Sequence, residues 1–252
     1  MSRWKAATIR DVHLLRSEPK TARPSAGGPP ARARAGTRDK PGRRIAVRIP
    51  APTLLLGALM VALGWVVTRV LAHTWPFNGE DAVDRALAAH RDGALDSVTG
   101  VLSTIADTPC TIALAAVAIL GARRLLHQWR PAAFIAVGLV IEVGVFLITT
   151  LLVHRARPGV VELDHSPPTS SFPSGHTAAA VVVYGAVAFL IARRTGRRQA
   201  WLLLLMPAAV AFARLYRGMH HPSDVVAGFI LGACALVIAA HAVLDPLPGG
   251  RR

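Results

Sequence analysis

Residues 173–192 read PSGHTAAAVVVYGAVAFLIA. The stretch opens with polar residues, including His176, and continues as a nearly unbroken apolar run. A helix of about 20 apolar residues is long enough to cross the hydrocarbon core of a bilayer. We therefore predict a membrane-spanning helix from Pro173 to Ala192 with a titratable side chain in its first turn. Ionisable groups at membrane depth are costly, and they tend to mark functional sites.

Apolar segments of similar length recur on both sides of this stretch. The chain is 52% hydrophobic with a mean hydropathy of +0.42, which is too apolar for an ordinary soluble domain. The weakest segment is interrupted by Asp107 and Pro109, and the polar residues 73–95 before it have the pattern of an amphipathic surface helix. We expect an all-α, polytopic membrane protein with a six-helix transmembrane bundle, whose other spans are Ala51–Ala72, 104–122, Pro131–Val153, Ala200–Ala213 with its flanks, and Asp224–Leu244.

Residues 1–50 carry 13 of the 29 Lys and Arg residues and three of the 14 acids. They are rich in Arg, Pro, Ala and Gly and show no apolar periodicity, so we expect a disordered basic tail. This charged region is too long to be the start of a cleavable signal peptide. The expected organisation is a cytoplasmic tail over 1–50, a six-helix domain over 51–245 with its motif core at 150–225, and a short cytoplasmic C-terminus at 246–252.

The net charge of +15 bears on both the partners and the orientation of the chain. A basic chain could bind nucleic acid, but Lys and Arg beside membrane spans set orientation and contact anionic lipid head groups. We therefore expect the membrane, and no nucleic acid, as its partner. With six spans, 22 Lys and Arg lie on the side of the tail and six lie on the other side. Because cytoplasmic loops are enriched in Lys and Arg, we predict a multi-pass plasma-membrane protein with both termini in the cytoplasm.

Three polar segments fall on the predicted extracytoplasmic side: HRARP at 154–158, PSGH at 173–176 and RLYRGMHHPSD at 214–224. Each has an ordinary interpretation by itself, as a charged loop, an interfacial residue at a helix start or an N-cap. Together they supply arginine forks that match phosphate oxygens, a helix N-terminus that favours anions and imidazoles that transfer protons near neutral pH. These are the groups that phosphoryl transfer through a covalent histidine intermediate requires.

The three segments together resemble the motifs of the type 2 phosphatidic acid phosphatase / vanadium haloperoxidase superfamily, which are K-x6-R-P, P-S-G-H and S-R-x5-H-x3-D. The second motif is complete in this chain, and the third is present as Arg214, His220 and Asp224 at the family spacing. The first is represented by Arg157 and the proline that follows it. The motifs occur in the family order, and the resemblance covers roughly residues 95–244.

The resemblance implies a role for each motif residue. His220 would be the nucleophile, Asp224 would orient it, and His176 would act as the general acid. The resemblance implies no metal and no other cofactor for hydrolysis. The residues that would hold the phosphate are Arg157, Ser174, Gly175 and Arg214.

Two positions depart from the family pattern. The lysine of the first motif would stand at Thr150, and the chain has no lysine after Lys40. We expect Arg155 to supply the missing cation and to join the phosphate-binding residues. A charge-assisted contact is worth about 1.5–3 kcal/mol, so its loss would weaken turnover without abolishing it. Ala213 replaces the serine before Arg214, a change that we expect to matter less.

Other polar residues near the motifs receive structural interpretations. We interpret Arg217 and His221 as loop or rim residues and Asp107 as a helix-end residue. Glu142, inside the third span, would either pair with a neighbouring helix or be protonated. The residues expected to cover a surface helix and to shape the lipid entrance are Asp81 and Asp84.

From these features we expect an integral membrane lipid phosphatase that acts at the extracytoplasmic face. Its substrate would be the phosphate or pyrophosphate monoester of a lipid, such as phosphatidic acid, phosphatidylglycerophosphate or a polyprenyl (pyro)phosphate. Two alternatives stay open: a lipid phosphotransferase that uses the same phosphohistidine, and a catalytically impaired homologue that binds lipid. Six apolar spans argue against a soluble haloperoxidase, and the oligomeric state stays open.

Overall fold

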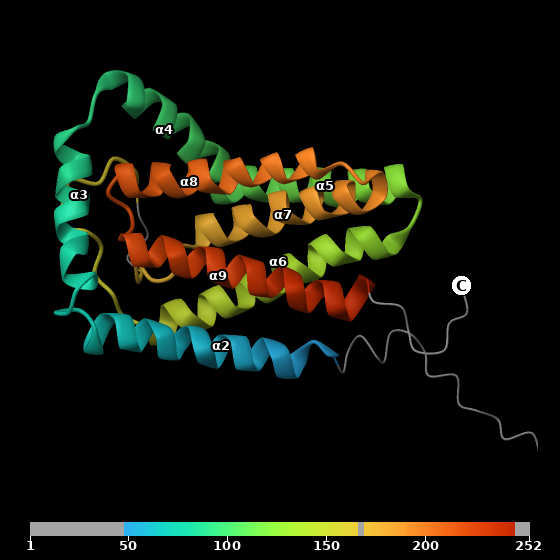
Figure 1. The fold of residues 1–252 in the computed structure, drawn as a ribbon, viewed down its shortest axis with the longest axis horizontal. Coiled ribbons are helices and arrows are strands. Elements are labelled where there is room, and N and C mark those ends of the chain that lie inside the picture. Colours follow the sequence, from blue (N-terminus) through green and yellow to red (C-terminus); the bar gives the residue numbers. More distant parts are fainter. Residues whose placement is uncertain (1–47, 166–168, 245–252) are drawn as a thin grey trace, which may run out of the picture. The chain divides into compact units, whose positions relative to one another are not determined.

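The computed structural model describes residues 48–165 and 169–244, and every regular element in these ranges is helical. The predicted tail and C-terminus lie almost entirely outside the described residues. The first helix of the bundle, α2, continues without a break into a short π-helical turn. The elements are α2 (Pro50–Trp65) with η1 (Val66–Val70), η2 (Phe77–Gly79), α3 (Glu80–Ala89), α4 (Gly93–Ala106), α5 (Thr108–Leu126), α6 (Trp129–Leu152), α7 (Gly175–Thr195), η3 (Arg198–Leu204), α8 (Leu205–Tyr216), α9 (Pro222–Ala239) and η4 (Ala240–Leu244) (Figure 1).

Six of the described helical segments are long and apolar enough to cross a membrane. Their most apolar windows have mean hydropathies between 1.4 and 2.5. The prediction of an all-α, six-span membrane protein is therefore confirmed. The six segments are Pro50–Val70, Thr108–Leu126, Trp129–Leu152, Gly175–Thr195, Arg198–Tyr216 and Pro222–Leu244.

The second span and the surface helix differ from the prediction. The span begins at Thr108 rather than at 104, and the polar segment before it folds as two helices, α3 and α4. The backbone of Asp107 is extended, which ends α4, and Pro109 lies in the first turn of α5. Proline is favoured in that turn because its missing N–H would have no helical partner there. The two residues that interrupt the apolar pattern therefore mark a helix boundary.

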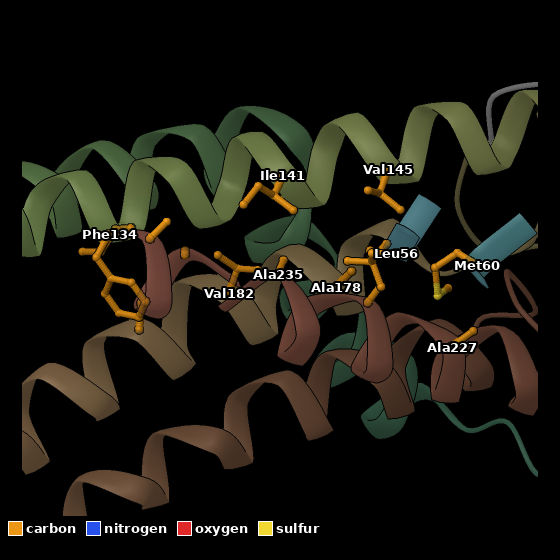
Figure 2. Packing of buried hydrophobic residues seen from close by; sticks show 14 of the residues in the cluster. Leu56, Met60, Phe134, Ile141, Val145, Ala178, Val182, Ala227 and Ala235 are labelled. Atoms are coloured by element: carbon orange, nitrogen blue, oxygen red, sulfur yellow. The ribbon is translucent and has the colours of Figure 1, made fainter. Parts of the chain in front are cut away.

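The core of the bundle lies between α2, α6, α7 and α9, which turn apolar side chains toward one another (Figure 2). Helices α7 and α9 approach closely at two glycines of α9. A Cβ on Gly228 would lie 2.5 Å from the carbonyl oxygen of Ser174, and one on Gly232 would lie 2.6 Å from that of Ala178. Small residues allow such close helix packing within a membrane. The labelled core residues are Leu56, Met60, Phe134, Ile141, Val145, Ala178, Val182, Ala227 and Ala235.

Helix α3 lies across the end of the bundle at which α8 ends and α9 begins (Figure 1). Helix α4 follows it and packs along α8. The loop after α6 and the start of α7 lie at the same end of the bundle. This arrangement brings the three polar segments of the sequence to one place.

Candidate active site

Direct contacts join the three polar segments. The Nη1 atom of Arg157 donates to the carbonyl oxygen of Met219 at 2.6 Å. The amide of Ser174 donates to the carbonyl oxygen of Asp224 at 2.9 Å, so the start of α7 is bonded to the first turn of α9. The predicted site residues therefore come from separate segments and meet at one end of the bundle.

His220 is only 4% exposed and has a defined orientation. Its Nδ1 atom lies 2.8 Å from the carbonyl oxygen of Ser171. Because a carbonyl oxygen only accepts hydrogen bonds, this contact assigns the proton to Nδ1 and leaves the lone pair on Nε2. Burial lowers the pKa of the His220 imidazole, although the neighbouring carboxylate of Asp224 opposes that shift. The ring is therefore held as a neutral imidazole.

Asp224 is fully buried in the first turn of α9. Its Oδ2 atom accepts a hydrogen bond from the amide of His221 at 2.9 Å and lies 3.8 Å from Nδ1 of His220. The sequence predicts that Asp224 orients the imidazole directly. In the structure the backbone of Ser171 takes the hydrogen bond of the ring, and Asp224 acts on it as a neighbouring charge. A carboxylate at this position is also stabilised by the helix N-terminus.

His176 is the second residue of α7, with a quarter of its side chain exposed. Its Nε2 atom lies 3.6 Å from Oδ1 of Asp107, so Asp107 contacts the site in addition to ending α4.

Ser174 and Gly175 form the start of α7. The hydroxyl of Ser174, which is buried, shares a hydrogen bond with that of Thr177. A Cβ on Gly175 would lie 2.8 Å from the ring of Phe146. The first amides of a helix have no intrahelical partner and favour an anion.

Arg214 is buried, and one of its donors is unused. Its Nη1 atom donates to the hydroxyl of Ser103 at 2.7 Å and to Oδ2 of Asp164 at 3.0 Å. Its Nε atom is buried and has no hydrogen-bond partner among the described residues. A buried N–H without an acceptor is destabilising, and a phosphate oxygen would supply one. The position is therefore suited to an anion.

Arg155 has different contacts from those expected of a phosphate ligand. Its guanidinium lies between two carboxylates: Nη1 is 2.5 Å from Oδ1 of Asp224, and Nη2 is 2.5 Å from Oε2 of Glu80. Nη1 also donates to the hydroxyl of Ser223 at 2.7 Å. The hydroxyl of Thr150, where the family has its lysine, is buried without a hydrogen-bond partner among the described residues.

Arg217 and His221 lie in the loop between α8 and α9, which was one of the two predicted alternatives, but they are not exposed at a rim. The prediction that Asp84 covers the surface of a helix is wrong. His221 is 7% exposed and its Nδ1 lies 2.7 Å from Oδ2 of Asp84, which is 1% exposed. Arg217 is mostly buried and donates from Nε to Oδ1 of Asp164 at 2.7 Å. The sequence places acids one turn apart on α3, but it does not show which residues meet them. Asp81 is largely exposed, as predicted.

A cluster that contains two acids lies at this end of the bundle, and one further acid is buried in α6. Ligand atoms of Asp81, Asp84 and His221 lie within 4.8 Å of one another, an arrangement that could hold a cation. None of these three residues belongs to the predicted phosphate-binding set. Glu142 is buried in α6, and its Oε2 atom has no hydrogen-bond partner in the described part of the chain.

Comparison with known proteins identifies similar sequences. Residues 112–246 match the PAP2 superfamily. A decaprenylphosphoryl-5-phosphoribose phosphatase of Mycobacterium tuberculosis is 32% identical over 139 residues, which is 54% of this chain and 71% of the relative. An undecaprenyl-diphosphatase of Sulfolobus acidocaldarius is 40% identical over 28% of this chain and 32% of its own length. These relatives are lipid phosphatases.

The fold has a counterpart among solved structures. The crystal structure of a transmembrane PAP2-type phosphatidylglycerolphosphate phosphatase from Bacillus subtilis aligns with a TM-score of 0.62. The alignment covers 77% of this chain and 94% of that protein, at 20% sequence identity. The matched family segment contains every predicted site residue, whereas α3 lies before it.

Proposed function

The chain belongs to the PAP2 superfamily, and from this premise we propose that it is a membrane phosphatase that hydrolyses a phosphate or pyrophosphate monoester of a lipid. The observation that carries the proposal is the state of His220. Its Nδ1 donates to a backbone carbonyl, so its Nε2 keeps the lone pair that a nucleophile needs. The buried Nε donor of Arg214, which has no partner among the described residues, could bind a phosphoryl oxygen. The proposed mechanism uses side chains, the N-terminal amides of α7 and water.

In the first step, Nε2 of His220 attacks phosphorus in line with the leaving oxygen. A nitrogen–phosphorus bond forms as the bond from phosphorus to the alcohol or phosphate leaving group breaks. His176 donates a proton to the departing oxygen, which avoids the release of a strongly basic alkoxide. Arg157, Arg214 and the N-terminus of α7 stabilise the charge on the phosphoryl oxygens.

In the second step, water attacks the phosphohistidine. His176, which is now neutral, accepts a proton from the water as the nitrogen–phosphorus bond breaks. The products are inorganic phosphate and His220 with its lone pair restored. Both steps require His176 and His220 to keep the same separation.

Two of the relatives suggest a class of substrate. They are named for the phosphate of a decaprenyl or undecaprenyl chain, and we propose a polyprenyl-linked phosphate for this chain as well. Six apolar spans allow such a chain to stay in the bilayer while its head group reaches His220. The distribution of Lys and Arg supports a site on the extracytoplasmic face of the plasma membrane.

The proposal is tested with the full-length protein purified in detergent with EDTA. The panel contains phosphatidic acid, phosphatidylglycerophosphate, and polyprenyl phosphates and pyrophosphates. We expect phosphate release that His220→Asn abolishes, because asparagine can still donate to Ser171 but cannot form the phosphohistidine. His127→Asn is the matched control, since His127 is exposed in the loop between α5 and α6. Asparagine also accepts the positive φ of that position.

The alternatives give different results in the same assay. Transfer of the phosphate to an added alcohol, in place of its release, would indicate a phosphotransferase. Normal phosphate release by His220→Asn would contradict the assignment of the nucleophile. A folded protein that releases no phosphate from any lipid would refute the proposed hydrolysis and favour a lipid-binding homologue.

A further inference from the structure

Two acids of α3, Glu80 and Asp84, lie outside the family motifs but contact the segment around the nucleophile, either directly or through Arg155. We propose that α3 is a positioning element of the active site, in which Glu80 and Asp84 hold the start of α9 through Arg155 and His221. This inference rests on the function proposed above. It gives Arg155 a positioning role in place of the phosphate-binding role expected from the sequence.

Glu80 acts as a cap for α9 that comes from another helix. Its Oε1 atom accepts a hydrogen bond from the amide of Ser223 at 2.6 Å, and its Oε2 atom accepts one from the Ser223 hydroxyl at 3.1 Å. Ser223 is the second residue of α9, where the amide has no partner within the helix. Glu80 is 7% exposed, so water does not readily replace it.

Arg155 connects this cap to the carboxylate of Asp224. It is bonded to Glu80 on one side and to Asp224 on the other, and the side chains of all three are at least 87% buried. The loss of Arg155 would leave two buried carboxylates without their counter-ion, which proteins tolerate poorly. The second carboxylate oxygen of Asp224, Oδ2, lies 3.8 Å from Nδ1 of His220. The connected charges of Glu80, Arg155 and Asp224 therefore extend to the nucleophile.

Asp84 provides a second attachment one helical turn further along α3. Residues four positions apart lie on the same face of a helix, and both acids face α9. Asp84 binds Nδ1 of His221, which is the residue directly after the nucleophile. The amide of His221 in turn binds Asp224. Helix α3 therefore contacts the segment from His220 to Asp224 at two positions, His221 and Ser223.

These contacts favour a positioning role over a general contribution to stability. Each one ends on a residue within four positions of His220, and neither Glu80 nor Asp84 belongs to the predicted phosphate-binding set. Arg214 is held separately, by Ser103 and Asp164. Loss of an α3 contact should therefore move the nucleophile relative to the bound phosphate without weakening phosphate binding. A displacement of about 1 Å can reduce a rate about 100-fold.

The first test compares steady-state kinetics of Glu80→Gln and Asp84→Asn with those of the wild type, on the best lipid of the panel. We expect kcat to fall about tenfold or more in both variants, with KM within about twofold, because only the reacting geometry changes. Arg155→Lys should retain more activity than Arg155→Met, since it keeps the charge between the two carboxylates. Arg85→Gln is the control, because Arg85 is exposed on the same helix.

The second test does not depend on activity. Hydrogen exchange measured by mass spectrometry should become faster in peptides that contain residues 220–225 in Glu80→Gln and Asp84→Asn, and stay unchanged in Arg85→Gln. Unchanged exchange would overturn the positioning role, as would a wild-type kcat in both variants. An inactive wild type would instead refute the proposed function, and the exchange result would still decide whether α3 holds the segment.

Discussion

The chemistry proposed for this site depends on the protonation state of His220. The imidazole is buried, and burial lowers its pKa despite the nearby Asp224. An exposed histidine has a pKa of about 6.5. His220 therefore stays neutral, with a lone pair on Nε2, in mildly acidic solution where an exposed histidine becomes a cation. The backbone carbonyl of Ser171 preserves the productive tautomer over the same range.

We predict that the acidic limb of the kcat/KM profile lies below about pH 6.5, because the limb reports protonation of the nucleophile in the free enzyme. The free energy of unfolding should also decrease as the pH falls. The unfolded chain binds a proton at His220 before the folded chain does, so this contribution is complete above about pH 6.5 and is lost as the pH falls further. A limb centred above that value would contradict a buried neutral nucleophile.

Thr150 provides a second test at the scale of a single residue. Its hydroxyl is buried without a partner among the described residues, and Arg155 is already bonded to two carboxylates. Thr150→Lys should therefore raise kcat/KM by about tenfold or more, because one charge-assisted contact to the phosphate would stabilise the transition state by that factor. Thr150→Met, which adds length without charge, is the control for packing. No gain with lysine would indicate that the phosphate already has enough cationic partners.

At the scale of helices, the site depends on how closely α7 and α9 approach. The start of α7 carries His176, and the start of α9 follows His220, so the spacing of these helices sets the separation of the two histidines. The contact of Gly228 with the backbone of Ser174 leaves no room for a side chain. The bond from the amide of Ser174 to the carbonyl of Asp224 fixes the register of the two helix starts.

Gly228→Ala should push the two helices apart. A Cβ would lie 2.5 Å from the carbonyl oxygen of Ser174, and overpacking of this kind costs about 1–3 kcal/mol. We expect a lower melting temperature together with a lower kcat. Gly144→Ala is the matched control, because a Cβ there has no atom within 4 Å, and alanine favours a helix. Wild-type activity in Gly228→Ala would show that the close approach is not needed for catalysis.

At the scale of the whole molecule, the bundle and the membrane together determine which side of the bilayer the site faces. The three polar segments meet at the α3 end of the bundle. With six spans, the sequence assigns six Lys and Arg to the side of these segments and 22 to the side of the N-terminal tail. From the positive-inside rule we predict that His220 lies outside the cytoplasm. A site on that face would meet head groups of the outer leaflet.

Cysteine labelling in intact cells tests this orientation. In a chain with Cys110 and Cys234 replaced by serine, Val161→Cys should react with a membrane-impermeant maleimide added from outside. Arg197→Cys, in the loop between α7 and η3, should react only after lysis. Both positions are exposed in the structure, so access depends on the membrane alone. The reverse pattern would place the site in the cytoplasm.

The six spans and the three motifs could be predicted from the sequence because they are local properties. The length and hydropathy of each apolar run are sufficient to identify a span, and the motif spacing is sufficient to identify candidate residues. Even the error in the second span had a local origin, since Asp107 and Pro109 mark a helix boundary that can be seen in the sequence. Composition and spacing therefore determined the fold class and the candidate histidines.

The partners of those residues were decided only by the tertiary structure. Ser171 and His220 are 49 positions apart, Arg155 and Asp224 are 69 apart, and Asp84 and His221 are 137 apart. A buried charge bonds to the partner that packing brings within reach, and no periodicity in the chain encodes that choice. Arg155, predicted as a phosphate ligand, and His221, predicted as a loop or rim residue, are both bonded in the structure to acids of α3. The sequence pattern gave no indication of these partners.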